Sequence, residues 1–195
     1  MELLLASSSS YRKSLLERLH LPFRQASPNI DETPHYGENA KDLVLRLSKD
    51  KAIALADNHP DTLIIASDQI ATLGNRILGK PGTEAKAIEQ LYSCRGQQVT
   101  FHTGLCLLNT QTGKSQLDCI EFRVWFRNLT IQQIEQYIKK EQPLDCAGSF
   151  KCEGLGVALF ERMAGDDPNS LIGLPLISLT GMLMNEGVDI LTLTP

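Results

Sequence analysis

Apolar positions along this chain follow two periods, one typical of strands and one typical of helices. The first run, MELLLA (residues 1–6), is short and almost wholly apolar, which predicts a buried strand. In SQLDCIEFRVWFRNL (residues 115–129), apolar side chains at every second position from Ile120 to Phe126 alternate with mainly polar ones. This alternation predicts a long strand with one buried face and one solvated face.

Helical spacing recurs between the strands. The segments with this spacing are Tyr11–His20, Asn39–Asp57, Thr83–Ser93, Thr130–Lys140 and a last one that starts at Leu174 and stops before Gly187. The remaining strands are predicted at 61–73, 76–81, 97–109 and 157–160, the first two joined in a hairpin by Gly74–Asn75. The proline-containing segment 21–34 is predicted to be an extended loop. Helices and strands mixed in this order predict an α/β fold with a mixed, strongly bent sheet flanked by helices.

The length and charge of the chain narrow the classes of function. With 195 residues the chain is long enough for one domain, or for one domain with two lobes. A formal net charge of -4 gives no general attraction to nucleic acid or to an acidic membrane surface, so any anion site has to be local. No run approaches the roughly 18 apolar residues of a membrane span, and the first residues do not resemble a signal peptide. Five cysteines without a C-x-x-C pair favour reduced thiols, so we expect a cytoplasmic protein.

The stretch LLLASSSSYRKSLLERL (residues 3–19) joins a strand, a serine-rich turn and the start of a helix. Such a turn presents hydroxyls and free backbone N–H groups to one point, and Arg12 adds a guanidinium that can bind a phosphate through two hydrogen bonds. The stretch is therefore a candidate anion site. Taken alone, it favours the alternative, in which the serines only cap the helix and Arg12 and Lys13 are solvated, because capping serines are common.

Two charged residues stand among apolar ones further along the chain. Lys51 shares a helical face with Leu43, Leu47 and Leu55. Its ammonium either extends along the surface to solvent or is held at the edge of a core and aimed into a cleft. Asp68 follows the apolar run TLIIAS, where an unpaired carboxylate would be costly to bury. Asp68 is therefore predicted to take part in the chemistry, as a general base or through a metal.

The acidic pair Asp31–Glu32, placed shortly before Pro34, has two interpretations. It forms a solvated turn, or it supplies a hard carboxylate ligand for Mg²⁺. That ion needs few protein ligands where substrate phosphates also bind it.

Three other motifs are weak. GNRILGKP (residues 74–81) has the G-x-x-x-x-G-K spacing of a phosphate-binding loop, but Pro81 stands where a Ser or Thr would bind the metal, and a hairpin fills its middle. SYRK (residues 10–13) has the S-x-x-K spacing of acyl-serine enzymes without their other motifs. Cys152 has no histidine that the sequence places beside it as an activating base.

Several of these pieces, taken in order, resemble one known family. LLLASSSSYRKSLLERL, DETP, LVLRLSKDKA, IIASDQ, GKP, LDCAGSFKCEGLG and LIGLPL together are similar to the motifs of the Maf family of nucleoside triphosphate pyrophosphatases. The resemblance covers nearly the whole chain and is greatest to the branch that acts on 7-methyl-GTP. It implies a two-lobed α/β fold of the Maf/inosine-triphosphatase type, with residues 1–195 as a single domain and a cleft between the lobes.

The resemblance also implies an activity, which is hydrolysis between the α- and β-phosphates with a divalent metal, Mg²⁺ or Mn²⁺. Asp68 matches the family's proposed proton acceptor, and Glu32 and Asp68 fall in its metal region. The positions that select the base are Tyr11, Gln69 and Glu153, and those that line the phosphates are Ser7, Arg12, Lys51 and Lys80. A carboxylate such as Glu153 and an aromatic face such as Tyr11 favour the positive ring of 7-methylguanine over neutral guanine.

Other functions stay open at this point. The same chemistry applies to UTP, dTTP or other modified nucleotides. The family's historical naming suggests instead a nucleotide-binding regulator of cell division with little turnover, and an acyl-serine hydrolase using Ser10 is a distant third. The sequence also leaves open whether the chain forms a homodimer.

Overall fold

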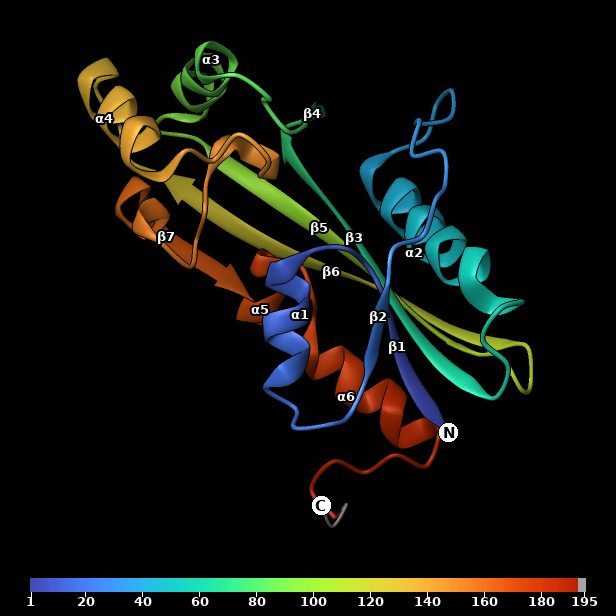
Figure 1. Cartoon of the computed structure of the whole chain (residues 1–195). Helices are drawn as coiled ribbons and strands as arrows, with labels where there is room; N and C mark the ends of the chain where they lie inside the picture. The colour runs from blue at the N-terminus through green and yellow to red at the C-terminus, as the bar shows by residue number, and fades with distance from the viewer. Residues whose placement is uncertain (193–195) are drawn as a thin grey trace.

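A mixed sheet of seven strands forms the centre of the computed structural model, which describes residues 1–192. The strands are β1 (Glu2–Ala6), β2 (Arg24–Ala26), β3 (Thr62–Leu73), β4 (Arg76–Leu78), β5 (Gln98–Asn109), β6 (Lys114–Phe126) and β7 (Phe160–Gly165). Their order across the sheet is β2-β1-β3-β5-β6-β7, with β4 paired to the far end of β3 (Figure 1).

One edge of β3 is open along part of its length. β1 runs parallel to β2 and to β3, and its pairing with β3 reaches Leu5 opposite Ile65. β4 pairs with β3 only from Ala71 onwards. Residues 67–70 of β3 are therefore paired with β5 on one side and, within residues 1–192, have no strand on the other. Because ligands of open α/β sheets bind beyond the carboxyl ends of parallel strands, this opening is where a site is expected.

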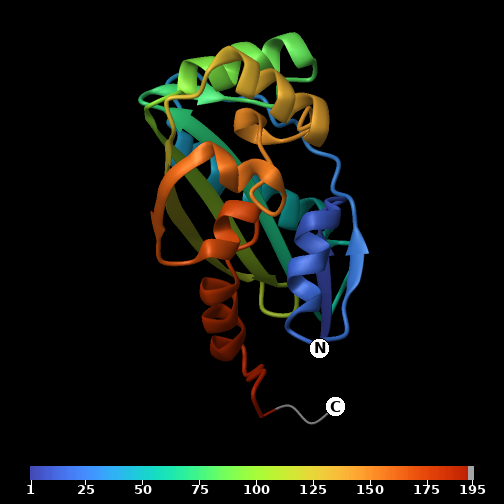
Figure 2. The ribbon, with the colours of Figure 1, turned by 90° about the vertical axis from the view of Figure 1, so that its left-hand side faces the viewer.

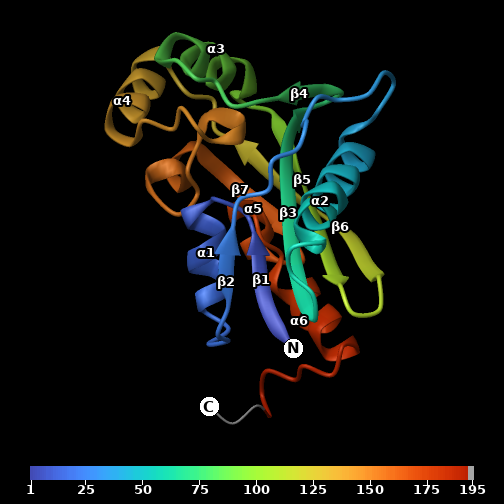
Figure 3. The ribbon, with the colours of Figure 1, turned by 45° about the vertical axis from the view of Figure 1, so that its right-hand side comes forward.

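Helices cover both faces of the sheet and one of its ends. They are α1 (Ser10–Glu17), α2 (Ala40–Ala56), α3 (Glu84–Cys94), α4 (Ile131–Glu141), α5 (Pro168–Ile172) and α6 (Leu176–Asn185), with short 3-10 helices η1 (Ala147–Ser149) and η2 (Leu155–Leu159). α2 lies on one face, and α1 and α6 lie on the other (Figure 3). α3 and α4 lie side by side over the end of the sheet (Figure 2). Among the residues described, no helix has the length and apolar character needed to cross a membrane.

The alternation of side chains along β3 connects the core to the site. Leu63 and Ile65 pack with the leucines of α1 and α6, whereas Ile64 and Ala66 pack on the face that carries α2. Because side chains alternate along a strand, position 68 falls on the α2 face and position 69 on the opposite face. The core pattern therefore decides which way each polar residue at the open edge points.

Four phenylalanines anchor the glycine-rich segment that leads into β7. Phe150 packs edge to face against Phe101, Phe126 and Phe160, with ring centroids 4.8 to 6.0 Å apart. Phe150 is 5% exposed. Aromatic pairs in this geometry add roughly 0.5–1.5 kcal/mol beyond the burial of their surface. The segment between α4 and β7 is thus fixed at Phe150, next to the open edge of β3.

The predicted α/β class, with a mixed sheet flanked by helices, is confirmed, and most predicted elements are found. The alternation in β6 is confirmed for Phe122, Val124 and Phe126, which are buried, and for Glu121 and Arg123, which are exposed, whereas Ile120 and Trp125 are both half-buried. The hairpin at Gly74–Asn75 is present, with Leu73 paired to Arg76.

The strand predicted at 157–160 is wrong. Residues Leu155–Leu159 form η2, and β7 begins only at Phe160. The backbone N–H groups of Gly154 and Gly156 both donate to the carbonyl oxygen of Lys151, which winds this segment into a turn. The apolar run VALF indicates buried side chains, but its pattern contains no information about the backbone hydrogen bonds that form this turn.

Smaller errors concern the ends of elements. The loop predicted over 21–34 contains the short strand β2, and α5 was not predicted. The first helix ends at Glu17 instead of His20, because the N–H groups of residues 18–20 bond three residues back in a tightened last turn. The last helix starts at Leu176, with Pro175 as its capping residue, and Gly187 follows its end with a positive φ of 78°.

The contact between α2 and β5 yields a prediction. A Cβ atom at Gly104 would lie 2.3 Å from the carbonyl oxygen of Val44 and 2.7 Å from Oγ of Ser48, so G104A must push α2 off the sheet. We expect the free energy of unfolding to fall by about 1–3 kcal/mol in urea titrations. The control is G181A on α6, where a Cβ meets open space, and where alanine should be neutral or stabilising by up to about 1 kcal/mol. Equal stability of G104A and the unmodified protein would contradict this close packing.

Candidate functional site

A pocket of about 710 Å³ lies at the open edge of β3. This volume falls in the range of small-molecule sites, about 300–1,000 Å³. The pocket is bounded by the turn after β1, the segment after β2, helix α2, the middle of β3, and the segments before α3 and before β7. Every residue predicted for the site lines it: Ser7, Tyr11, Arg12, Glu32, Lys51, Asp68, Gln69, Lys80 and Glu153.

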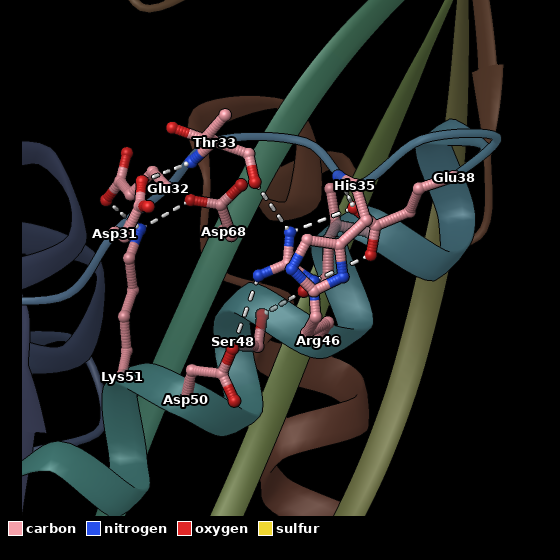
Figure 4. A network of polar contacts seen from close by, with 11 residues as sticks. Asp31, Glu32, Thr33, His35, Glu38, Arg46, Ser48, Asp50, Lys51 and Asp68 are labelled. Carbon is pink, nitrogen blue, oxygen red and sulfur yellow. Dashed lines mark hydrogen bonds and ion pairs between the residues drawn. The ribbon is translucent and has the colours of Figure 1, made fainter.

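An ion pair between α2 and β3 lines the pocket. Nζ of Lys51 lies 2.5 Å from Oδ1 of Asp68 and 2.8 Å from Oε1 of Glu32 (Figure 4). Lys51 is 7% exposed and Asp68 is 8% exposed, whereas the side chain of Glu32 is 58% exposed. Lys51 is therefore held in the pocket and does not extend to solvent, which decides between its two interpretations.

Arg12 reaches the same region from the first turn of α1. Its Nε donates to the carbonyl oxygen of Gly173 at 2.8 Å, and one terminal nitrogen lies 3.4 Å from Oγ of Ser7. Burial lowers the pKa of Arg12, while the carboxylates of Asp68 and Glu32 act to raise it. An arginine keeps its charge under such a shift, so the guanidinium is a fixed cation aimed at the pocket.

The serine turn both caps the helix and shapes the pocket. Oγ of Ser9 accepts from the backbone N–H of Arg12 at 3.3 Å, which is the N-cap of α1. Oγ of Ser7 accepts from the N–H of Ser9, and the carbonyl of Ser7 is held by the amide of Gln25 on the segment around β2. Lys13 is exposed and lies 3.8 Å from Glu17. Of the two cations at the start of this helix, Arg12 alone lines the pocket.

The two acidic residues Asp31 and Glu32 differ in their contacts: Asp31 forms a turn, whereas Glu32 faces the pocket. Oδ1 of Asp31 accepts from the backbone N–H of Thr33 at 2.9 Å and so forms the turn. Glu32 instead points to Lys51 (Figure 4). Burial acts to raise the pKa of Glu32. The hydrogen bond from Lys51, with the positive charges of Lys80 and Arg12, outweighs burial, so its pKa is lowered and the side chain is a carboxylate at neutral pH.

A second group of charges surrounds Tyr11 at the other side of the pocket. Burial raises the pKa of Tyr11. Cys146 and the carboxylates of Asp145 and Glu153 raise it further, and Lys151 opposes them. The ammonium of Lys151 bonds the carbonyl oxygen of Glu141 at 2.9 Å and does not line the pocket. The wall near Tyr11 therefore carries two carboxylates, whereas the wall near Asp68 carries three cations beside the two carboxylates of Asp68 and Glu32.

Gln69 occupies the face of β3 opposite to Asp68. Its amide nitrogen lies 2.7 Å from the carbonyl oxygen of Ser170 and 3.1 Å from that of Leu171, both on α5. It also lies 3.1 Å from Oγ1 of Thr103 on β5. The amide nitrogen is thus committed to the protein, and the carbonyl oxygen of Gln69 is the group available to a ligand. Its assignment to base selection stays a prediction.

Sequence reasoning missed the part played by the α5–α6 connection. The carbonyl oxygen of Gly173 accepts both from Arg12 and from the buried hydroxyl of Ser67, at 2.8 and 2.9 Å. Asp167, which is 2% exposed, caps α5 and also accepts from the N–H of Ile177 at 2.7 Å. The Asp167–Pro168 pair, a capping residue followed by proline at the first helical position, was the signal that could have located α5.

Glu32 and Asp68 are the residues of this pocket that could hold a divalent cation. Glu32 and Asp68 come from different segments, yet both place an oxygen beside the same Nζ atom. Residues 1–192 contain no group of three or more His, Cys, Asp or Glu side chains arranged to hold a metal. Two carboxylates without further protein ligands match Mg²⁺ or Mn²⁺ bound together with substrate phosphates, since Mg²⁺ commonly uses only one or two carboxylates there.

The two cysteines that line the pocket are poor nucleophiles. Burial raises the pKa of Cys146 to about 12 and that of Cys152 to about 12, and neighbouring carboxylates add to both shifts. Both are therefore thiols at neutral pH, and thiolate is the reactive form. This agrees with the exclusion of Cys152 as a nucleophile, and all five cysteines are free.

Comparison with known proteins assigns the family. The model of the family described as Maf-like protein matches residues 2–186. A protein of Pseudomonas putida named 7-methyl-GTP pyrophosphatase is 60% identical over 186 residues, which are 95% of this chain and 97% of the relative. A protein of the same name from Alcanivorax borkumensis is 57% identical over 188 residues, 96% of this chain and 95% of the relative. The protein of that name from Pseudomonas aeruginosa is 55% identical over 189 residues, 97% of this chain and 98% of the relative.

The fold is also similar to a solved structure, that of the Staphylococcus aureus Ham1 protein. The TM-score is 0.53 at 13% sequence identity, with 95% of this chain and 100% of the other covered. At this identity the likeness concerns the fold alone, and it agrees with the predicted fold type.

The buried ion pair yields a second prediction. K51M leaves Asp68 buried without its cation, so we expect the free energy of unfolding at pH 7 to fall by about 3 kcal/mol. The control K13M removes an exposed pair and should cost less than about 0.5 kcal/mol. Both values come from urea unfolding followed by circular dichroism. A loss for K51M no larger than that for K13M would show that the pair is solvated and not buried.

Proposed function

The chain belongs to the Maf family, and we propose that it hydrolyses 7-methyl-GTP to 7-methyl-GMP and pyrophosphate. The observation that carries the proposal is the division of charge in one pocket, with cations around Asp68 and carboxylates around Tyr11. A 7-methylguanosine triphosphate has the opposite division, because its phosphates are negative and its methylated ring is positive. The three relatives described above, which bear the name of this activity, support the same substrate.

In this proposal the triphosphate binds among Ser7, Arg12, Lys51 and Lys80. Arg12 offers a fork of N–H groups, and the hydroxyl of Ser7 stands beside it. Lys80 lines the pocket from the segment before α3, and its charge acts on Glu32, so it belongs to the same wall. These cations offset the phosphate charge locally in a chain whose formal net charge is -4.

The base then lies against Tyr11 and Glu153. A cation over an aromatic face gains about 0.5–2 kcal/mol, and a nearby carboxylate adds a Coulombic attraction that neutral guanine does not receive. Gln69 contributes its carbonyl oxygen as an acceptor, since its amide nitrogen is bonded to α5. These three residues are our candidates for selecting the methylated base.

Asp68 is our candidate for the proton acceptor. Its Oδ1 bonds Lys51, and we assign Oδ2 to the water that attacks the α-phosphorus. The water gives a proton to Asp68 as the new P–O bond forms, and the bond from the α-phosphorus to the bridging oxygen breaks, so that pyrophosphate leaves. Glu32 and Asp68, together with the phosphates, would hold a Mg²⁺ or Mn²⁺ ion, which would supply charge stabilisation and lower the pKa of bound water.

We further propose a free nucleotide substrate and a cytoplasmic location. The overall negative charge gives nucleic acid no general attraction, and five free thiols suit a reducing compartment. A homodimer is compatible with this proposal and stays a prediction. The assignment of residues 1–195 to a single two-lobed domain likewise stays a prediction.

The test is a nucleotide panel with Mg²⁺ or Mn²⁺, in which both products are identified. We expect 7-methyl-GTP to give 7-methyl-GMP and pyrophosphate, with a higher kcat/KM than GTP, UTP or dTTP. D68N should reduce turnover by about 10²–10⁴-fold, as expected for loss of a general base. The control D57N, at the exposed end of α2, should leave turnover unchanged. Preference for UTP or dTTP would contradict the proposed base, and saturable binding without a monophosphate product would favour a regulator.

Recognition of the base gives a further prediction. E153Q removes a negative charge from the wall around Tyr11, so the ratio of kcat/KM for 7-methyl-GTP to that for GTP should fall about fivefold, equivalent to a charge contact of about 1 kcal/mol. The matched control is E161Q, an exposed glutamate on β7 outside the pocket, which should keep the ratio. An unchanged ratio in E153Q would remove Glu153 from base selection.

A further inference from the structure

The segment between β2 and α2, residues 27–39, forms one wall of the pocket and carries Glu32. Ser27, Pro28, Glu32 and Pro34 line the pocket from this segment. Residues 31–37 are all exposed, so little apolar packing fixes their position. Something else has to hold Glu32 beside Lys51, because an exposed segment of this length otherwise has many conformations.

Arg46 on α2 binds this segment at two places. Its Nε and one terminal nitrogen contact both carboxylate oxygens of Glu38, at 2.7 and 2.9 Å, and the same terminal nitrogen lies 3.1 Å from the carbonyl oxygen of Thr33 (Figure 4). Its other terminal nitrogen lies 3.3 Å from Asp50 on α2. Oε2 of Glu38 also accepts from the backbone N–H of His35 at 2.9 Å.

These contacts surround Glu32 without touching it. Thr33 is the next residue after Glu32, and Glu38 is the last residue before the cap of α2. Arg46 and Lys51 belong to the same helix, so the helix that presents the ammonium also fixes the segment that brings Glu32 to it. The hydrogen bonds from Arg46 lower the pKa of Glu38 to about 2, so the pair stays charged throughout the neutral range.

We propose that Arg46 is a positioning residue, which sets the affinity of the pocket for its divalent cation by holding Glu32 beside Asp68. This rests on the proposed function, in which Glu32 and Asp68 bind that cation with the phosphates. Residues that orient metal ligands from behind typically change metal affinity about 10–100-fold when they are removed. Since the hydrogen bonds of Arg46 go to Glu38, Asp50 and Thr33 and to neither Asp68 nor Lys51, its loss should alter metal binding much more than the chemical step.

Two variants and one control test the proposal. R46A removes all contacts to the segment, and R46K keeps the charge without the planar fork that spans both oxygens of Glu38. The control R24A removes another two-pronged Arg–Glu pair, that of Arg24 with Glu2 between β2 and β1. Thermal unfolding confirms that each variant is folded, and if R46A does not fold, R46K carries the comparison against R24K.

Three measurements follow. The first is the Mg²⁺ concentration that gives half-maximal pyrophosphate release from 7-methyl-GTP, which should rise about tenfold in R46A and less in R46K, with kcat at saturating Mg²⁺ within about twofold. The second is amide hydrogen exchange of residues 27–38 in the protein without metal or nucleotide, which should be faster in R46A. The third is the affinity for Mn²⁺ alone, which should be lower in R46A. At equal total Mn²⁺, the electron paramagnetic resonance signal of free Mn²⁺ should therefore be stronger in R46A than in the unmodified protein. R24A should change none of them.

The outcomes separate this proposal from the proposed function. If the unmodified protein hydrolyses 7-methyl-GTP and R46A has the same half-saturating Mg²⁺ concentration, the positioning role is overturned and the function stands. Faster exchange without weaker Mn²⁺ binding also overturns it, because Arg46 then orders the segment without affecting the cation. If the unmodified protein releases no pyrophosphate from any nucleotide, the proposed function fails, and exchange together with Mn²⁺ binding still decides the role of Arg46.

Discussion

The buried ion pair between Lys51 and Asp68 is the interaction on which the rest of the site depends. Burying these two charges costs more free energy than burying two aliphatic side chains. The attraction between Lys51 and Asp68 at 2.5 Å, with the further attraction between Lys51 and Glu32, offsets that cost. Ala66 on β3 and Leu47 and Ala52 on α2 are apolar and buried nearby, so the core could have been continued through this place. A charged pair kept where an apolar one would fit favours a role in chemistry over a role in stability.

The sheet makes the pocket by stopping strands at different lengths. β1 and β2 end together, β3 runs on beyond them, and β4 pairs only with the far end of β3. The polar turn after β1, the segment after β2 and the middle of β3 therefore meet at one place. Asp68 and Gln69 are neighbours in β3 and point to opposite faces of the sheet. Asp68 therefore contacts Lys51 in the cationic wall, whereas Gln69 contacts α5.

Sequence patterns predicted the long elements, and the family resemblance named nine residues that line one pocket, but neither predicted the connections among those residues. Long periodic runs such as 62–73 and 98–109 bury many side chains, so their pattern is clear. β2 has three residues, too few for a period, and η2 is produced by backbone bonds to Lys151 that no side-chain pattern encodes. The hydrogen bond from Arg12 to the carbonyl oxygen of Gly173 could not be predicted either. Every residue has a carbonyl oxygen, and only the tertiary structure brings this one to Arg12.

The strand that carries Asp68 and Gln69 constrains how this chain can diverge. Inserting or deleting one residue within β3 would exchange the faces of every following side chain, sending the acid towards α5 and the amide towards α2. The residues near Tyr11 lie in a turn and a glycine-rich segment that such a frame shift does not reach. Over evolution, the segments around the base can change both by substitution and by insertion or deletion. The strand β3 can change by substitution only, because an insertion or deletion would exchange its faces. Diversity among relatives should therefore accumulate in which nucleoside is accepted, while the geometry of bond cleavage is inherited unaltered.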